Sequence, residues 1–369
     1  MKKQLRAAAV FGVAALALAA CGSKSTPAAS SSSPSSTPTS ASASASAAAY
    51  NACMVLDTGG VDDRSFNQSS WQGMTDANTK NPNITVSYVA SNSQNDYTPN
   101  LTAEQSKGCA TIIAVGGLMS DAVKAAAAAN PTQQYAEVDA SSSGPNVYGI
   151  QFNTAQGGFL GGYLAAGMTK SGIVATYGGL NIPPVTIYMD GFWEGVQYYN
   201  KIKNKTVKVL GWNETNQKGG TFAQSFTDQG KGRSITQSFI SAGADIIFPV
   251  AGGTGLGSGA AAQASGGKVS VIWVDTDGCV SAPTYCSVFL TSVVKGLASA
   301  VTTYVTTAAG GTALGGQNFI GTLSNSGTGL APYHDFASKV PAALQAEVTQ
   351  VGADITSGKI TLTSPSQPK

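Results

Sequence analysis

The 369-residue sequence has a single histidine, His334, and no Cys-x-x-Cys pair. Zinc centres are built mainly from cysteine and histidine at short spacings, so we predict no metal site. Charged residues make up only 11% of the chain and leave a net charge of +2. Because the lysines and arginines form no basic stripe, a nucleic-acid partner is not expected.

Signatures of catalysis are also scarce. No Gly-x-Ser-x-Gly elbow stands near a plausible base, and we expect a structural role for His334, which lies in a loop near the carboxyl end. The run 255–260, Gly-Leu-Gly-Ser-Gly-Ala, fits a dinucleotide-binding pattern. It comes late in a glycine-rich stretch, so we interpret these glycines as letting the backbone approach a ligand. The chain is therefore expected to be neither an enzyme nor a cofactor-binding protein.

The amino terminus is typical of an exported protein. Lys2, Lys3 and Arg6 precede an apolar run, 7–20, that is too short to span a bilayer, and Cys21 follows small residues. This pattern predicts a signal peptide over 1–20. The position of the cysteine resembles a bacterial lipobox, which would make Cys21 the lipidated first residue of the mature chain. An ordinary signal peptide with an incidental cysteine is the alternative.

Residues 21–49 are mostly serine, alanine, threonine and proline, and they cannot bury enough apolar surface to fold. We expect a flexible tether that joins a lipid anchor to a folded body outside the cell membrane. No later segment has the ~20 continuous apolar residues of a transmembrane helix.

Four cysteines follow Cys21, and export permits disulfides. Cys53 and Cys109 open two strand-like runs that would be neighbours, about 4.8 Å apart, in a doubly wound sheet. Cys279 and Cys286 flank a short loop. We predict both pairs as disulfides. Four cysteines allow three connectivities, and buried free thiols are the alternative.

Apolar strand-like runs alternate with helical patterns along the rest of the chain. Strands are predicted at 52–57, 84–90, 110–116, 134–139, 147–152, 172–177, 207–212, 244–250 and 269–275. Helices are predicted at 65–79, 120–129, 154–168, 185–201, 230–242 and 257–264. The tail adds a helix at 292–307, a strand at 319–323 and a helix at 339–356.

Continuous apolar strands joined by helices indicate parallel sheets covered on both faces, and so many strands suit two sheets better than one. We predict an α/β protein of two Rossmann-like lobes that close on a ligand by hinge motion. One lobe would take 50–153 with part of 276–320, and the other 154–275 with part of 316–360.

Charged side chains stand where predicted strands meet a crevice. Asp57, Asp139 and Asp275 each end a strand, and Lys295 is predicted just inside the helix that begins at 292. Carboxyl ends of strands border the ligand crevice in open α/β sheets. A cap or a solvated turn would explain any one acid alone, but three in equivalent places favour a binding site.

Neighbouring residues indicate the kind of ligand. Phe66 and Asn67 open the helix after Asp57, and they add a flat apolar surface and an amide with both donors and acceptors. Gly252 lies in the glycine-rich turn after the strand at 244–250. This combination suits a planar, hydrogen-bonding small molecule.

Several segments resemble, in order, the basic membrane protein family. These are lipoprotein substrate-binding components of ABC importers, similar to the purine nucleoside receptor. The matching segments are 57–67 (Asp-Thr-Gly-Gly-Val-Asp-Asp-Arg-Ser-Phe-Asn), 190–196 (Asp-Gly-Phe-Trp-Glu-Gly-Val), 243–248 with 251–255, 274–277 (Val-Asp-Thr-Asp), 291–295 (Thr-Ser-Val-Val-Lys) and 329–336.

The resemblance implies a type I periplasmic-binding-protein-like fold that delivers a nucleoside to an ABC permease, and we expect a monomer. Phe66 would stack on the base, and Asn67 and Asp139 would contact its polar edges. Asp57 would support that wall or bind directly. Asp275 and Lys295 would hold ribose hydroxyls, with Gly252 approaching through its backbone. For a second stacking wall the candidates are Tyr188, Phe192 and Phe248, each equally explained as core.

Two alternatives remain open at this point. The start of segment 57–63 is like the calcium-binding start of nucleoside hydrolases, but Gly59 stands where that pattern has a ligand. A surface sensor with the same ligand is the other. The family pattern Val-Asp-x-Asp is often followed by glutamine, whereas Gly278 and a cysteine-bounded loop follow it here, which affects the expected specificity.

Overall fold

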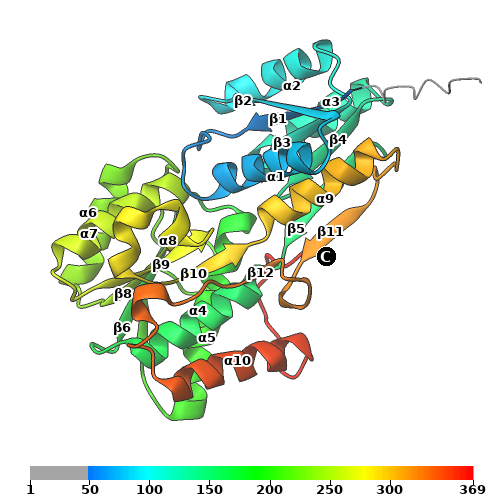
Figure 1. Ribbon diagram of the computed structural model, residues 1–369. Coiled ribbons are helices and arrows are strands. Elements are labelled where there is room, and N and C mark those ends of the chain that lie inside the picture. Colours follow the sequence, from blue (N-terminus) through cyan, green and yellow to red (C-terminus); the bar gives the residue numbers. More distant parts are fainter. Residues whose placement is uncertain (1–48, 369) are drawn as a thin grey trace, which may run out of the picture. The chain divides into compact units, whose positions relative to one another are not determined.

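The computed structural model describes residues 49–368 (Figure 1). The predicted signal peptide, the predicted lipid attachment at Cys21 and all but the last residue of the predicted tether lie outside this range. Within it, no helix combines the length and the apolar character needed to cross a membrane.

The first sheet is entirely parallel, with strand order β11-β5-β4-β3-β1-β2. Its strands are β1 (Tyr50–Leu56), β2 (Ile84–Ala90), β3 (Thr111–Val115), β4 (Gln134–Val138), β5 (Val147–Phe152) and β11 (Asn318–Gly321). Successive side chains of a strand point to opposite faces. Met54 and Leu56 of β1 therefore pack under α1 (Phe66–Lys80) and α9 (Leu297–Ala309), and Val55 packs under α2 (Tyr97–Ser106) and α3 (Ser120–Ala129).

The second sheet has strand order β12-β10-β9-β8-β6-β7, and only β12 is antiparallel. Its strands are β6 (Ile173–Gly178), β7 (Lys208–Leu210), β8 (Ile246–Val250), β9 (Ser270–Asp275), β10 (Phe289–Lys295) and β12 (Thr328–Leu330). Helices α4 (Ala155–Met168), α5 (Pro183–Lys203) and α10 (Ala342–Thr356) contribute to the core on one face. Helices α6 (Gln229–Ser241) and α7 (Leu256–Ala264) cover the other, and the short α8 (Gly278–Ser281) follows β9. The predicted α/β class with two parallel sheets is confirmed.

The predicted helix at 292–307 is wrong in its first part. That part belongs to strand β10, and α9 begins only at Leu297. Thr291, Val293 and Val294 are β-branched, which favours a pleated strand between neighbours, and Gly296 separates the two elements. Lys295 therefore ends a strand and does not lie inside a helix. Three further elements, α2, α8 and β12, were not predicted.

Glycines let α4 and α5 pack closely in the second half of the chain. A Cβ atom on Gly162 would lie 2.0 Å from the Phe192 carbonyl oxygen, and one on Gly195 would lie 2.1 Å from the Phe159 carbonyl oxygen. Such distances are shorter than any van der Waals contact. Only glycine fits at these two positions, and the close approach fixes α5, which supplies several residues to the site described below.

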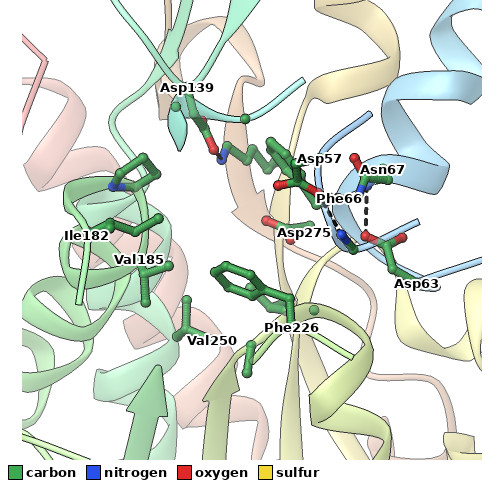
Figure 2. Close-up of a pocket in the computed structure, with 18 of the residues that line it drawn as sticks. Asp57, Asp63, Phe66, Asn67, Asp139, Ile182, Val185, Phe226, Val250 and Asp275 are labelled. Carbon is green, nitrogen blue, oxygen red and sulfur yellow. Dashed lines mark hydrogen bonds and ion pairs between the residues drawn. The ribbon is translucent and has the colours of Figure 1, made fainter. Parts of the chain in front are cut away.

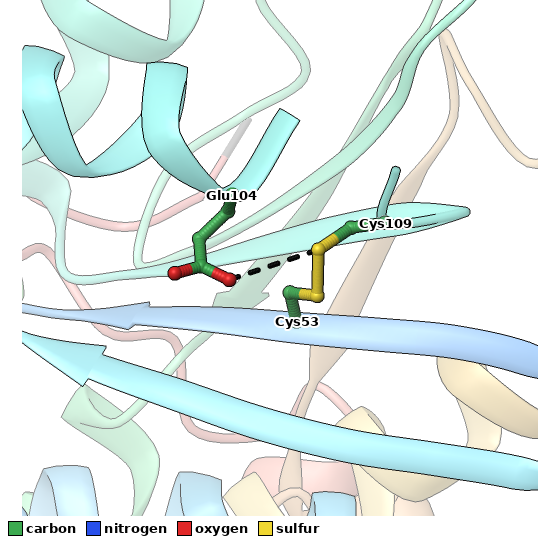
Figure 3. A group of neighbouring side chains, drawn as sticks. All are labelled: Cys53, Glu104 and Cys109. Carbon is green, nitrogen blue, oxygen red and sulfur yellow. Dashed lines mark hydrogen bonds between the residues drawn. A yellow bond between two sulfur atoms is a disulfide. The ribbon is translucent and has the colours of Figure 1, made fainter. Parts of the chain in front are cut away.

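Both predicted disulfides are present. Cys53 of β1 is joined to Cys109, just before β3, with 5.9 Å between Cα atoms, and Cys279 is joined to Cys286 across 4.5 Å. The buried carboxylate of Glu104 lies beside the first pair (Figure 3) and forms an ion pair of 2.6 Å with Lys107. The first disulfide thus ties two adjacent strands of the first sheet, and the second closes the loop that follows β9.

Candidate functional site

One cavity of about 570 Å³, partly open to solvent, lies between the carboxyl ends of the two sheets. All seven residues that the sequence predicted for ligand binding line it (Figure 2). They come from both sheets and from α1: Asp57, Phe66, Asn67, Asp139, Gly252, Asp275 and Lys295. The structure therefore brings the predicted residues together, and their roles toward a ligand stay predictions.

The turn between β1 and α1 is organised by two buried carboxylates. Asp57 Oδ1 accepts hydrogen bonds from the Gly59 backbone N–H at 2.9 Å and from Asn67 Nδ2 at 2.7 Å. Asp63 accepts the backbone N–H groups of Ser65, Asn67 and Gln68 at 2.8–3.1 Å. The N–H groups of Asn67 and Gln68 are otherwise unpaired donors of the first turn of α1, so the Asp63 side chain caps the start of the helix.

Asp63 also lines the cavity, and it was not among the predicted site residues. Burial raises the pKa of Asp63 to about 7, although its three backbone hydrogen bonds oppose the shift. Burial likewise raises the pKa of Asp57. An acidic residue just before a helix is a recognised start signal in a sequence, and it could have identified Asp63 as a cap.

The orientation of the Asn67 amide follows from its neighbour. Because Nδ2 donates to Asp57, the carbonyl oxygen Oδ1 points elsewhere, and this buried atom has no hydrogen-bond partner within residues 49–368. A buried acceptor without a donor costs free energy, about 1–3 kcal/mol. Since Asn67 lines the cavity, the site presents an acceptor that a ligand N–H or O–H group can satisfy.

A buried ion pair joins the two sheets at the cavity. The Lys295 ammonium at the end of β10 lies 2.6 and 2.7 Å from the two oxygens of Asp139, which follows β4. The same ammonium lies 4.8 Å from the centre of the Phe66 ring, within the range of a cation–π contact. Burial raises the pKa of Asp139, and the Lys295 charge opposes that rise.

Asp139 and Asp275 have the same backbone conformation in the two sheets. Both adopt left-handed φ values, +68° and +67°, which non-glycine residues rarely take. Strained backbone of this kind tends to occur where function requires a particular side-chain direction. Each aspartate ends or directly follows a strand, so the strain turns a carboxylate from the strand end into the cavity.

Asp275 is the second link between the sheets. Its Oδ1 accepts a hydrogen bond of 2.6 Å from the Tyr188 hydroxyl, and its Oδ2 accepts one of 2.7 Å from the Ser65 hydroxyl. Burial and the charge of Asp275 raise the pKa of Tyr188 well above its usual value, so this tyrosine stays a donor. Nearby, the Arg64 carbonyl accepts from Thr276 Oγ1 at 3.0 Å. These contacts fasten the start of α1 to the end of β9.

Apolar side chains form the remaining walls. Phe66 belongs to α1, and Phe226, from the loop before α6, lines the same cavity together with Ile182, Val185 and Val250 (Figure 2). Of the three predicted candidates for a second aromatic wall, Tyr188 lines the cavity. Phe192 and Phe248 are fully buried core residues and do not line it.

Phe226 was not among the predicted site residues, and it lies two residues before Asp228, the acidic cap of α6. Phe66, in contrast, follows its capping residue Asp63 and is the first residue of α1, so the two phenylalanines share no position in the sequence pattern. Gly252, at the turn after β8, has a φ of +51°, which fits the predicted close approach of backbone to the cavity.

Parallel sheets whose carboxyl ends face one shared cavity are characteristic of periplasmic-binding-protein-like ligand-binding proteins, and this chain is an α/β protein of that class. A solved ABC transporter solute-binding protein from Aeropyrum pernix K1 has a similar fold. The TM-score is 0.75 at 22% identity, and the match covers 85% of this chain and 93% of that one.

The sequence matches the family described as ABC transporter substrate-binding protein, PnrA-like, over residues 50–364, and the chain belongs to this family. A CD4+ T-cell-stimulating antigen of Listeria monocytogenes is 33% identical over 307 residues, which are 79% of this chain and 82% of the relative. The ABC transporter nucleoside-binding protein BmpA of Lactococcus lactis is 31% identical over 236 residues, 61% of this chain and 64% of that protein. The predicted family is thereby confirmed.

Membership in this family establishes the general activity of the protein. Substrate-binding proteins of ABC transporters bind a small molecule and deliver it to a membrane permease, and their family and fold are not those of enzymes. A small-molecule ligand for the cavity follows from this class, and its chemical identity does not.

Proposed function

We propose that the protein captures a nucleoside, with a purine nucleoside as the preferred ligand, and passes it to an ABC permease. The main support for the proposal is that one cavity combines aromatic walls with buried hydrogen-bond acceptors. Phe66 and Phe226 offer flat surfaces for a base, and Asn67 Oδ1, which has no hydrogen-bond partner among the described residues, can accept from a base N–H group. The name of the Lactococcus relative is consistent with this choice.

The charge of the cavity supports a neutral ligand. Among residues 49–368, four acidic side chains line it, Asp57, Asp63, Asp139 and Asp275, together with one ammonium, that of Lys295, which is already paired. Burying a phosphate or carboxylate among these acids would leave like charges unpaired, which is costly. Hydroxyl and amino groups, in contrast, donate hydrogen bonds to carboxylates, so a ribose with an amino-bearing base fits better than a nucleotide.

The wider arrangement belongs to the same proposal. The two sheets with their helices, 50–153 and 154–275 with the returning tail, act as lobes that close on the ligand without bond chemistry. The protein works as a monomer, held outside the cell membrane through lipidated Cys21. The hydrolase alternative requires Asp63 as a calcium ligand, whereas both of its oxygens accept backbone N–H groups of α1.

A calorimetric screen of the purified protein tests the proposal. We expect heat of binding with adenosine, guanosine or inosine, and none with adenosine 5′-monophosphate, free ribose or glucose. A protein that bound glucose and no nucleoside would refute the assignment. Release of free base during the titration would instead indicate hydrolysis.

The two aromatic walls give a further prediction. We expect Phe66→Ala and Phe226→Ala each to weaken binding of adenosine, guanosine and uridine by a similar factor, about tenfold, because stacking contributes about 1–3 kcal/mol and does not depend on base identity. Phe222→Ala is the matched control, since Phe222 lies in the same loop but packs on Trp212 outside the cavity. Isothermal titration would measure the constants. A loss confined to one base would contradict stacking.

A further inference from the structure

The carboxyl-terminal segment after α10, Thr363–Pro368, runs back along α5 in the opposite direction (Figure 1). The Thr363 backbone N–H donates to Glu194 at 2.8 Å, and the Ser364 hydroxyl donates to Asp190 at 2.6 Å. One helical turn further toward the start of α5, the Ser366 and Thr186 hydroxyls lie 3.0 Å apart. Contacts at three successive turns fix the register of the segment on the helix.

Asp190 forms the centre of this attachment. It is fully buried, and its carboxylate accepts hydrogen bonds from Trp212 Nε1 at 2.9 Å, Gln217 Nε2 at 2.8 Å and the Ser364 hydroxyl. Burial raises the pKa of Asp190. A buried carboxylate needs its full set of donors, so the segment is held by an interaction that is costly to break.

The far end of the segment reaches the crossing between the two sheets. Gln367 Oε1 accepts a hydrogen bond of 2.9 Å from Asn153 Nδ2. Asn153 directly follows β5 of the first sheet and precedes α4, and its backbone N–H donates to the Gly321 carbonyl of β11 at 2.7 Å. The segment thus connects α5 to the place where the chain passes from one sheet to the other.

The same end borders a second cavity of about 850 Å³, partly open to solvent. Ser366 and Pro368 line it together with Ser120 and Ala140 from the side of the first sheet. This cavity shares Asp139 and Pro184 with the ligand cavity, among other residues. Helix α5 also supplies Val185 and Tyr188 to the ligand cavity, from the turns that the segment contacts.

We propose that Thr363–Pro368 is a positioning strap: it holds the first turns of α5 against the crossing at Asn153, and thereby favours the closed arrangement that retains ligand. Ser364 and Gln367 are its positioning residues, and neither lines the ligand cavity. The inference rests on the proposed function for the closure of the two lobes and for the choice of adenosine as the probe ligand.

The test compares the full-length double variant Ser364→Ala/Gln367→Ala with the wild type. We expect the dissociation rate of adenosine to rise about tenfold while the association rate changes less than about twofold, because the strap acts after encounter. Hydrogen exchange at residues 152–158 should become faster, since local opening of the crossing becomes easier. Lys359→Ala is the matched control. Its exposed ammonium forms an ion pair of 3.1 Å with Asp354 of α10, and both measurements should equal the wild type.

Gln367→Ala alone is the gentler variant, because it leaves all three donors to Asp190 in place. A smaller rise in the adenosine dissociation rate and in the hydrogen-exchange rate at 152–158 for this variant supports the strap. A fall in melting temperature with unchanged dissociation and unchanged exchange at 152–158 overturns it, since the segment would then be structural only. If the wild type fails to bind adenosine, the proposed ligand is wrong, and the exchange measurement alone decides on the strap.

Discussion

Lys295→Met should weaken nucleoside binding by at least about a hundredfold. Methionine keeps the length and much of the volume of the side chain but removes the ammonium that lies 2.6 Å from Asp139. Removing one partner of a buried pair leaves an uncompensated charge, which costs about 3–5 kcal/mol. Asp57 and Asp275 lie near enough to raise the pKa of Asp139 further, and among the described residues that line the cavity Lys295 is the one with a cationic side chain.

The pH dependence of binding distinguishes the loss of the ion pair with Asp139 from a change in the shape of the cavity. Burial raises the pKa of Asp139 in the wild type, and without Lys295 the opposing effect of the ammonium disappears, so the pKa rises further. Lowering the pH then protonates Asp139 and removes the unpaired charge. We therefore expect the affinity of Lys295→Met to recover partly between pH 8 and pH 5.5, while Lys295→Arg binds nearly as the wild type does.

Isothermal titration of the three proteins at both pH values provides the measurement. Lys268→Met serves as the control for a general change of charge, because Lys268 is exposed and lies outside the ligand cavity. Wild-type affinity in Lys295→Met at pH 8 would remove the ion pair from the mechanism. A loss of affinity that did not depend on pH would point to shape instead.

The position of Lys295 shows what sequence patterns could and could not predict. Strong alternation of apolar strands and helices located nearly every strand of both sheets, because the central strands are buried on two faces and stand out as apolar runs. In the stretch 289–307, hydrophobicity does not drop between the strand and the helix, so the sequence pattern does not mark their boundary. Only the pairing of β10 with β9 and β12 decides where the strand ends.

The aspartates were predictable for a related reason. Asp57, Asp139 and Asp275 end or follow clearly recognisable strands, and the carboxyl ends of parallel strands share one edge. Phe226 and Asp63 lie in irregular segments, where no periodicity indicates direction, and their place at the cavity depends on how the loop before α6 and the turn after β1 fold. The link between Asp275 and Ser65 joins residues 210 positions apart, which no local pattern reveals.

That link leads to the second large effect. We expect Asp275→Ala to weaken nucleoside binding by about ten- to a hundredfold, because hydrogen bonds to a charged group contribute about 1.5–3 kcal/mol each. The change removes an acceptor for ligand hydroxyls and also the contact with Ser65 that fastens α1 to β9. It leaves the buried Tyr188 hydroxyl without its acceptor, so the free energy of unfolding should fall as well.

Two matched variants separate these contributions. Ser65→Ala removes only the contact between the sheets, and Tyr188→Phe removes only the hydroxyl that positions Asp275. Neither Ser65→Ala nor Tyr188→Phe removes the carboxylate of Asp275. If Asp275 binds ligand directly, the loss of affinity in Asp275→Ala should therefore exceed the sum of the losses in these two variants. Titration calorimetry with adenosine, together with thermal unfolding without ligand, resolves the comparison. Equal losses in Asp275→Ala and Ser65→Ala would mean that Asp275 serves closure alone, and unchanged affinity in Asp275→Ala would exclude it from the site.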